Sequence, residues 1–146
     1  MKLQRILITD SSTLIAIERV NLLKLLDKID FKIIIPKGVL EELGEKGHLL
    51  TGRKNIEIAG LSGNTLKLKR DLIRIGLGEG ESECIAIANK LKISFILCDD
   101  RKVLRQIFFS SNKSIRDLKV LGFSFFLTEF FKKGLLKDIW FAFNDV

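Results

Sequence analysis

Two adjacent acidic residues end an apolar segment that is suited to the interior of a sheet. The segment reads FILC at residues 95–98, and Asp99 and Asp100 follow it directly. Two carboxylates at the mouth of a core are unfavourable unless they cap a turn or a helix, or unless a cation is bound beside them. Asp10 follows another apolar run, RILIT, in the same way. Which explanation holds depends on the elements that position these acids.

Apolar runs with little alternation predict the strands that carry the acids. Such runs are typical of parallel strands that are buried on both faces. The three clearest are Arg5–Thr9, Phe31–Ile35 and Ser94–Cys98. Shorter strands are expected at Ile56–Ala59 and near Leu118–Leu121, and the rest of the segment from 44 to 63 is expected to be loop.

Helical patterns occupy the segments between the strands. Ser11-Ser12 is expected to be the N-cap of a helix over Thr13–Arg19, and Pro36 is expected to open a helix that Gly44 ends. The other expected helices are Leu22–Leu26, Glu81–Leu91, Arg101–Ile107 and Phe125–Lys133. Strands that alternate with helices along 146 residues predict a single three-layer α/β domain, in which helices flank a central, mostly parallel sheet.

The expected fold brings five acidic residues to one edge of the sheet or beside it. The carboxyl ends of parallel strands share an edge where ligands bind, and this edge receives Asp10, Asp99 and Asp100. Glu42 lies at the flank of the buried face of its helix, and Glu83 continues the apolar stripe of another helix. Each acid alone is explained by a turn, an N-cap or the positive end of a helix. Together, like charges raise one another's pKa unless a cation holds them, and carboxylate oxygens suit Mg²⁺ or Mn²⁺.

Other catalytic chemistries lack the residues that they need. His48 is the single histidine, which argues against a Ser-His-Asp triad or a histidine pair. The glycines of GLGEGE at residues 76–81 lack the preceding strand that phosphate binding requires. Cys84 and Cys98 have no C-x-x-C spacing and are expected to be buried thiols. Carboxylates with a divalent metal and basic surroundings favour phosphoryl chemistry.

The composition is that of a folded protein, with 47% hydrophobic and 29% charged residues. The net charge of +7 fits a polyanionic partner such as RNA, and it equally serves solubility. No apolar window reaches the roughly 20 residues of a membrane span, and the N-terminal apolar stretch is too short for a signal peptide. We therefore expect a cytoplasmic protein with no membrane partner.

Four stretches follow one another along the chain, and they read ILITDSSTLI, IIIPKGVLEEL, GESECIAIA and ILCDDRKVLR. In this order they resemble the PIN-domain family, which includes many metal-dependent ribonucleases and the VapC toxins of toxin–antitoxin pairs. The later KVLGFSFFLTEFFKKGLL resembles the closing strand and helix of one PIN subgroup. The resemblance covers most of the chain and leaves the middle and the last ten residues unmatched.

The resemblance implies a set of site residues. The four catalytic acids of the family fall on Asp10, Glu42, Glu83 and Asp100. The metal ligands are expected to be Asp10, Glu83 and Asp100, with Asp99 as an alternative ligand or a supporting residue. Supporting positions fall on Ser12, on Glu41 as the alternative to Glu42, and on Glu81. Cys98 stands where the family usually has a hydroxyl residue.

The resemblance also implies phosphodiester hydrolysis with Mg²⁺ or Mn²⁺, an RNA substrate and a homodimer. Cationic clusters on either side of the acids are expected to grip RNA or to be solvated helix faces. They are Lys67, Lys69, Arg70 and Arg74, and then Arg101, Lys102 and Arg105. The Phe-rich segment from 123 to 131 is expected to be mostly core, and a surplus of rings there would suit a dimer or antitoxin contact.

Two function classes stay open. One is a metal-dependent endoribonuclease, including the toxin of a toxin–antitoxin pair with an antitoxin protein as its partner. The other is a catalytically silent PIN-like module that binds RNA or protein. The intact set of acids favours the enzyme.

Overall fold

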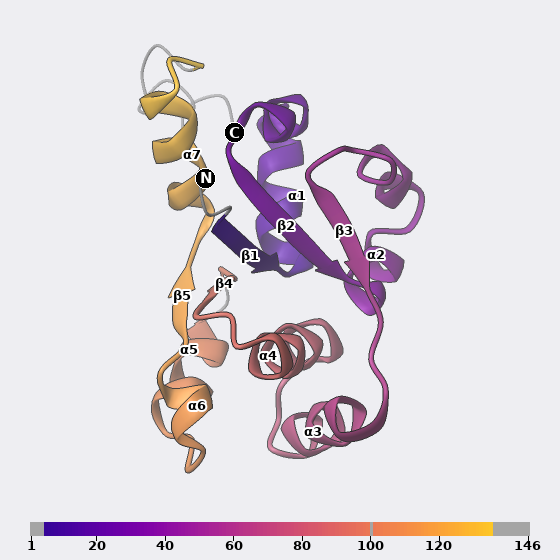
Figure 1. The fold of residues 1–146 in the computed structure, drawn as a ribbon, viewed down its shortest axis with the longest axis vertical. Coiled ribbons are helices and arrows are strands. Elements are labelled where there is room, and N and C mark those ends of the chain that lie inside the picture. The colour runs from indigo at the N-terminus through magenta and orange to yellow at the C-terminus, as the bar shows by residue number, and fades with distance from the viewer. Residues whose placement is uncertain (1–4, 100, 136–146) are drawn as a thin grey trace.

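The fold is a three-layer α/β domain built on a five-stranded sheet, in a computed structural model that describes residues 5–99 and 101–135 (Figure 1). The strands are β1 (Arg5–Thr9), β2 (Phe31–Pro36), β3 (Ile56–Ala59), β4 (Phe95–Leu97) and β5 (Lys119–Leu121). Their order is β3-β2-β1-β4-β5, and every neighbouring pair is parallel. The predicted fold class is confirmed, and the sheet is parallel throughout.

The strand order reverses between β1 and β4. From β1 the chain proceeds outwards to β2 and β3, and it then crosses back to place β4 on the other side of β1. Ile8 pairs with Ile96 and Thr9 with Leu97 across this junction. In open parallel sheets such a reversal leaves a crevice outside the carboxyl ends of the two strands, and ligands bind there. The fold therefore singles out one place for a site.

Helices cover the sheet. They are α1 (Ser11–Arg19), α2 (Lys37–Leu43), α3 (Gly63–Arg74), α4 (Glu79–Leu91), α5 (Arg101–Phe108), α6 (Lys113–Arg116) and α7 (Phe123–Lys132), with two short 3-10 helices, η1 (Leu23–Lys28) and η2 (Gly44–Leu49). Helix α4 packs against β1, β2 and β4 on one side and against α3 on another, as Figure 1 shows. Every residue of α4 from 82 to 88 is therefore buried. None of the helices in the described residues is long and apolar enough to cross a membrane.

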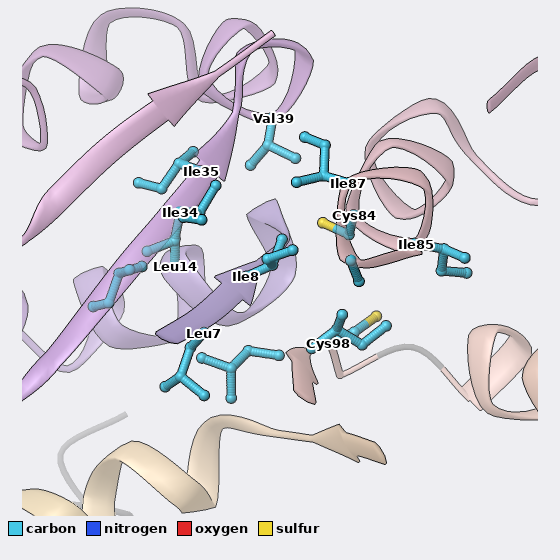
Figure 2. Close-up of a cluster of buried hydrophobic side chains, with 14 of the residues drawn as sticks. Leu7, Ile8, Leu14, Ile34, Ile35, Val39, Cys84, Ile85, Ile87 and Cys98 are labelled. Atoms are coloured by element: carbon cyan, nitrogen blue, oxygen red, sulfur yellow. The ribbon is translucent and has the colours of Figure 1, made fainter. Parts of the chain in front are cut away.

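The core follows from the apolar runs of the sequence. Ile33, Ile34 and Ile35 are all buried although successive side chains of a strand point to opposite faces, so β2 is covered on both faces. Figure 2 shows Cys84 of α4 near Ile8 of β1, within one continuous cluster of buried side chains. Both cysteines are buried and free, as expected from their spacing.

Several helices differ from the sequence predictions. Helix α1 begins at Ser11, and its N-cap is Asp10 instead of Ser11-Ser12, because the Asp10 carboxylate accepts the Thr13 N–H. Helix α3 is absent from the predicted elements. Its buried positions, Thr65 and Leu72, are separated by a run rich in lysine that hides the apolar face. The expected helix at 22–26 is the 3-10 helix η1, which begins one residue later and continues to Lys28.

Candidate active site

Two acidic residues flank the point where the strand order reverses. Asp10 directly follows β1, and its N–H donates to the Leu97 carbonyl of β4 at 3.0 Å, so the ends of the two strands are tied together. Asp99 lies two residues beyond β4. The negative charge of Asp99 acts on Asp10 and helps to raise its pKa. The carboxylates that the sequence predicts at this edge are thus neighbours.

The Asp10 carboxylate is buried, with 1% of the residue exposed. Burial is the main cause that raises the pKa of Asp10 above its ordinary value. Hydrogen bonds from the Cys98 side chain, the Ser12 hydroxyl and the Thr13 N–H lower the pKa, and the charge of Asp99 raises it further. All the donors are neutral. The protein therefore holds a carboxylate in a position that disfavours its charge.

Hydroxyl groups at the start of α1 connect the two acids. Ser12 Oγ donates to the Asp10 carboxylate at 2.8 and 2.9 Å and accepts the N–H of Asp99 at 3.1 Å. Thr13 Oγ1 donates to Asp99 Oδ2 at 2.8 Å, and the Phe123 N–H at the start of α7 donates to the same carboxylate at 3.0 and 3.1 Å. Ser12 therefore contacts both acids, and its supporting role beside a metal stays a prediction. Thr13 is an addition that the sequence analysis missed.

The pair of acids has no cationic partner within the described residues. Ion pairs elsewhere involve the carboxylates of Glu18, Asp27, Asp30, Glu57, Asp71, Glu83 and Glu129. Asp10 and Asp99 form none of these pairs. Adjacent carboxylates without a counter-charge are unfavourable, and their oxygens are the ligands that Mg²⁺ and Mn²⁺ prefer. The residues present at this position fit a divalent cation.

Glu83 is held differently, by a lysine and a backbone amide. Lys69 Nζ of α3 lies 2.7 Å from Glu83 Oε1, and the Gly38 N–H of α2 donates to Glu83 Oε2 at 2.9 Å. The Lys69 side chain is 17% exposed, so the ion pair is largely shielded from water. A Cβ at position 38 would overlap the Glu83 carboxylate, which explains a glycine in the first turn of α2. The negative charge of Glu83 is thus balanced by the Lys69 ammonium group.

Glu42 faces the start of α1. Its Oε2 accepts a hydrogen bond from Ser11 Oγ at 2.8 Å, and a Cβ at Gly80 would lie 2.9 Å from its Oε1. Glu42 is exposed, and so is Glu41, whose side chain forms no hydrogen bond or ion pair with other described residues. These contacts agree with the predicted place of Glu42 at the flank of the buried face of α2.

The buried thiol of Cys84 lies close enough to several acids to be affected by their charges. Burial raises the pKa of Cys84 well above its ordinary value, and the charges of Asp10, Glu81 and Glu83 raise it further, together with Cys98. The thiol is therefore protonated and acts as a small apolar group of the core. The acids at the end of β1 and along α4 share one electrostatic environment.

The structure describes four of the five acids that the sequence analysis expects at this edge of the sheet or beside it. Asp100, the expected fourth acid, lies outside the described residues. Among the residues that the structure does describe, no group of three or more histidine, cysteine, aspartate or glutamate side chains is arranged to hold a metal ion. The structure brings Asp10 and Asp99 together and places Glu42 and Glu83 on the neighbouring helices α2 and α4.

The cationic residues expected to bind RNA occupy two helices. Lys67, Arg70 and Arg74 are exposed on α3, and Arg74 forms an i,i+3 ion pair with Asp71 at 3.6 Å. Lys69 is the exception on this helix because of its ion pair with Glu83. Arg101, Lys102 and Arg105 are exposed on α5, which begins next to the acids.

Comparison with known proteins agrees with this fold. A family model described as a PIN domain matches residues 6–145. The match continues through the middle of the chain and into the last ten residues, beyond the motifs that carry the resemblance. A search of the curated proteins found no match.

Proposed function

Because the chain belongs to the PIN-domain family, whose members are generally nucleases, we propose that it is a metal-dependent endoribonuclease. The observation that carries the proposal is the pair of acids Asp10 and Asp99, which flank the reversal of strand order without a cationic partner among the described residues. Phosphodiester hydrolysis needs charge neutralisation and an activated water, and a divalent cation supplies both when bound.

The residues of the site have distinct proposed roles. Asp10 and Asp99 would hold Mg²⁺ or Mn²⁺ together with Asp100, and Glu42 and Glu83 complete the proposed catalytic set. The Ser12 hydroxyl, which bonds to Asp10 and to the Asp99 N–H, orients the two strand ends toward each other. Glu81 is close enough to influence Cys84 and adds negative charge beside the same edge.

The exposed cations of α3 are the proposed contacts to the phosphate backbone of the substrate. Lys67, Arg70 and Arg74 lie on the helix that packs against α4, which carries Glu83. Lysine and arginine contacts to phosphates release counterions, so they make binding salt-dependent. Lys69 contributes through Glu83 in this structure, because its ammonium group is engaged there.

A second candidate function is a binding module of the same family that does not cleave. The observation that favours it is the ion pair between Lys69 and Glu83, since it neutralises an acid that catalysis would use. In this reading the cations bind RNA and the acids are structural, with Asp10 as the N-cap of α1.

The two candidates are separated by a cleavage assay with single-stranded RNAs of varied sequence. The nuclease predicts cleavage that requires Mn²⁺ or Mg²⁺ and stops in EDTA. Cleavage that persists in EDTA contradicts the metal mechanism. Binding of these RNAs without cleavage in either metal identifies the silent module instead.

The narrower proposal is a VapC-like toxin that acts in the cytoplasm, as a homodimer, and is neutralised by an antitoxin protein. Its support is the resemblance of the sequence motifs to that subgroup. A small DNA-binding protein encoded beside this reading frame, whose co-expression relieves growth arrest by the chain, is the expected result. Growth that is unaffected by expression of the active nuclease contradicts the toxin role.

A further inference from the structure

Two adjacent phenylalanines project from the end of α5 into solvent. Phe108 is 74% exposed and Phe109 is 78% exposed, more than the other large hydrophobic side chains of the described residues. Their ring centroids are 5.1 Å apart and the ring planes meet at 87°, so the pair presents aromatic faces in two directions. Exposed aromatic surface of this kind is unfavourable in water and indicates a binding partner.

The rings border a hollow of about 380 Å³ that also has cationic walls. Arg105 of α5 and Arg116 of α6 both line it. Both arginines are exposed, and neither forms an ion pair with another described residue. Figure 1 shows α5 and α6 together next to β5, so residues of both helices can meet one ligand.

The most exposed apolar side chains of the hollow are its two phenylalanines. Ile107 and Leu118 also line it, but they are already buried in the core, and the remaining aliphatic side chain is Leu104, which is half exposed. A ligand in this hollow would therefore contact mainly the two rings, together with Leu104. Flat rings beside arginines that form no ion pair with other described residues are an arrangement on which the bases of a single strand stack while its phosphates pair with the cations.

The charge of the segment around the hollow distinguishes a second copy of the chain from a polyanion as the partner. Between residues 101 and 119 the cationic side chains are Arg101, Lys102, Arg105, Lys113, Arg116 and Lys119, and Asp117 is the single acid. A second copy of the chain that docked here about a twofold axis would bring like charges together, which is unfavourable. A polyanion is complementary to the whole segment.

The hollow lies at the far end of the helix that begins beside the acids of the candidate active site. Helix α5 begins two residues after Asp99 and ends at Phe108. Its eight residues span about 12 Å at 1.5 Å per residue. A strand bound at the acids therefore reaches the two rings within a few nucleotides.

We propose that Phe108, Phe109, Arg105 and Arg116 form a subsite for single-stranded RNA, which guides one side of the substrate along α5 toward the acids. The proposal rests on the proposed nuclease function and extends it from the reacting phosphate to the path of the strand. It concerns binding, so it is testable without turnover.

The test measures the affinity of the full chain for a fluorescein-labelled oligouridylate of about 12 nucleotides by fluorescence anisotropy in EDTA. The double variant Phe108→Ala/Phe109→Ala is expected to bind at least about 30-fold more weakly, because stacking contributes about 1–3 kcal/mol per base and two rings are removed. Its salt dependence should equal that of wild type, since no charge is removed. The double variant Arg105→Ala/Arg116→Ala should lower the magnitude of the slope of log affinity against log salt by about 1.4, or about 0.7 for each lost phosphate contact.

Matched controls lie elsewhere on the surface. Phe131→Ala removes a ring of α7 that is 46% exposed, and Arg19→Ala removes an exposed cation of α1; neither should change affinity or salt slope. Phe108→Trp, with Phe109 unchanged, should bind RNA about as tightly as wild type because tryptophan also stacks on bases. Because the rings are mostly outside the fold, all these variants should melt at about the wild-type temperature.

Three results would overturn the subsite. They are no measurable binding of the oligonucleotide to wild type, an unchanged affinity of the phenylalanine variant, and an equal loss in Phe131→Ala. A phenylalanine variant that binds RNA normally but loses self-association would assign the surface to a second copy, and normal RNA binding with normal self-association would leave it to another protein. Failure of the nuclease proposal looks different: the subsite binds RNA as expected, while wild type with Mn²⁺ cleaves none.

Discussion

Replacement of Asp10 by asparagine separates a metal ligand from a structural cap. Asparagine caps a helix about as well as aspartate, so the bond from the Thr13 N–H to residue 10 is retained. What is lost is one buried negative charge, whose pKa is raised by burial and by Asp99. The metal-free variant should therefore be as stable as wild type or more stable, because desolvation of the charge and repulsion from Asp99 are both relieved.

Bound metal should reverse this order. At a free Mn²⁺ concentration of about 100 times the dissociation constant, wild type gains about 2.7 kcal/mol in its free energy of unfolding. For a chain of 146 residues this corresponds to a rise of roughly 8 °C in Tm, at about 3 °C per kcal/mol. Asp10→Asn should show a small fraction of that rise, and its RNA cleavage should fall by orders of magnitude.

The assay is a set of thermal melts followed by far-UV circular dichroism, with EDTA and with Mn²⁺. Asp30→Asn is the matched control, since Asp30 immediately precedes β2 and lies at the opposite, amino edge of the sheet. It pairs with Lys133 on the surface, so its loss should change Tm little and leave the Mn²⁺ response intact. A destabilised Asp10→Asn protein with an undiminished Mn²⁺ shift would refute the assignment of Asp10 to the metal.

Three further predictions concern charge and packing around the acids. In EDTA, the advantage of Asp10→Asn over wild type should vanish as the pH falls. The protonated Asp10 of wild type contributes stability that is fully present below its ordinary pKa of 3.8 and is lost as the pH rises through the raised pKa of the folded state. If the stability difference in favour of Asp10→Asn grows as the pH falls, the raised pKa is contradicted. Lys69→Met should destabilise the metal-free protein by about 3 kcal/mol, because Glu83 is left buried and unpaired, and Lys69→Met/Glu83→Gln should recover part of the loss. If the single variant melts like wild type, the ion pair contributes little. Gly38→Ala should lower the free energy of unfolding by about 1–3 kcal/mol because the added methyl group overpacks against Glu83. Gly60→Ala, with open space around it, should not, and equal effects of the two changes would exclude the close approach.

Local sequence pattern is enough to predict the sheet. The consecutive isoleucines of β2 predict a strand buried on both faces, and the structure shows this burial. Strand β3 lies at the predicted residues although its neighbours in the chain carry little pattern. Helix α3 was missed because its lysines interrupt the apolar period, and its packing against α4, a tertiary contact, makes it part of the fold.

The position of the candidate site could be predicted from the sequence, but the contacts of its individual side chains could not. Acids that follow predicted parallel strands must share an edge, which is why Asp10 and Asp99 could be placed together. The ion pair of Glu83 with Lys69 could not, because it joins two helices whose relative position depends on the whole fold. The role of Thr13 as a donor to Asp99 has the same origin, since these residues are neighbours only across the junction of β1 and β4.

The burial of individual phenylalanines could not be predicted from residue type alone. Phe126 and Phe130 of α7 are fully buried, in agreement with the prediction of a mostly buried Phe-rich helix. Phe108 and Phe109 have the same chemistry and end in solvent, because Val103 and Ile107 already supply the buried face of α5 and the outer face of that helix has no element over it among the described residues. Residue type sets the free energy gained on burial, and the topology decides which rings are buried. The two rings that the fold leaves outside, beside Arg105 and Arg116, are for this reason more informative about function than the five of the Phe-rich segment.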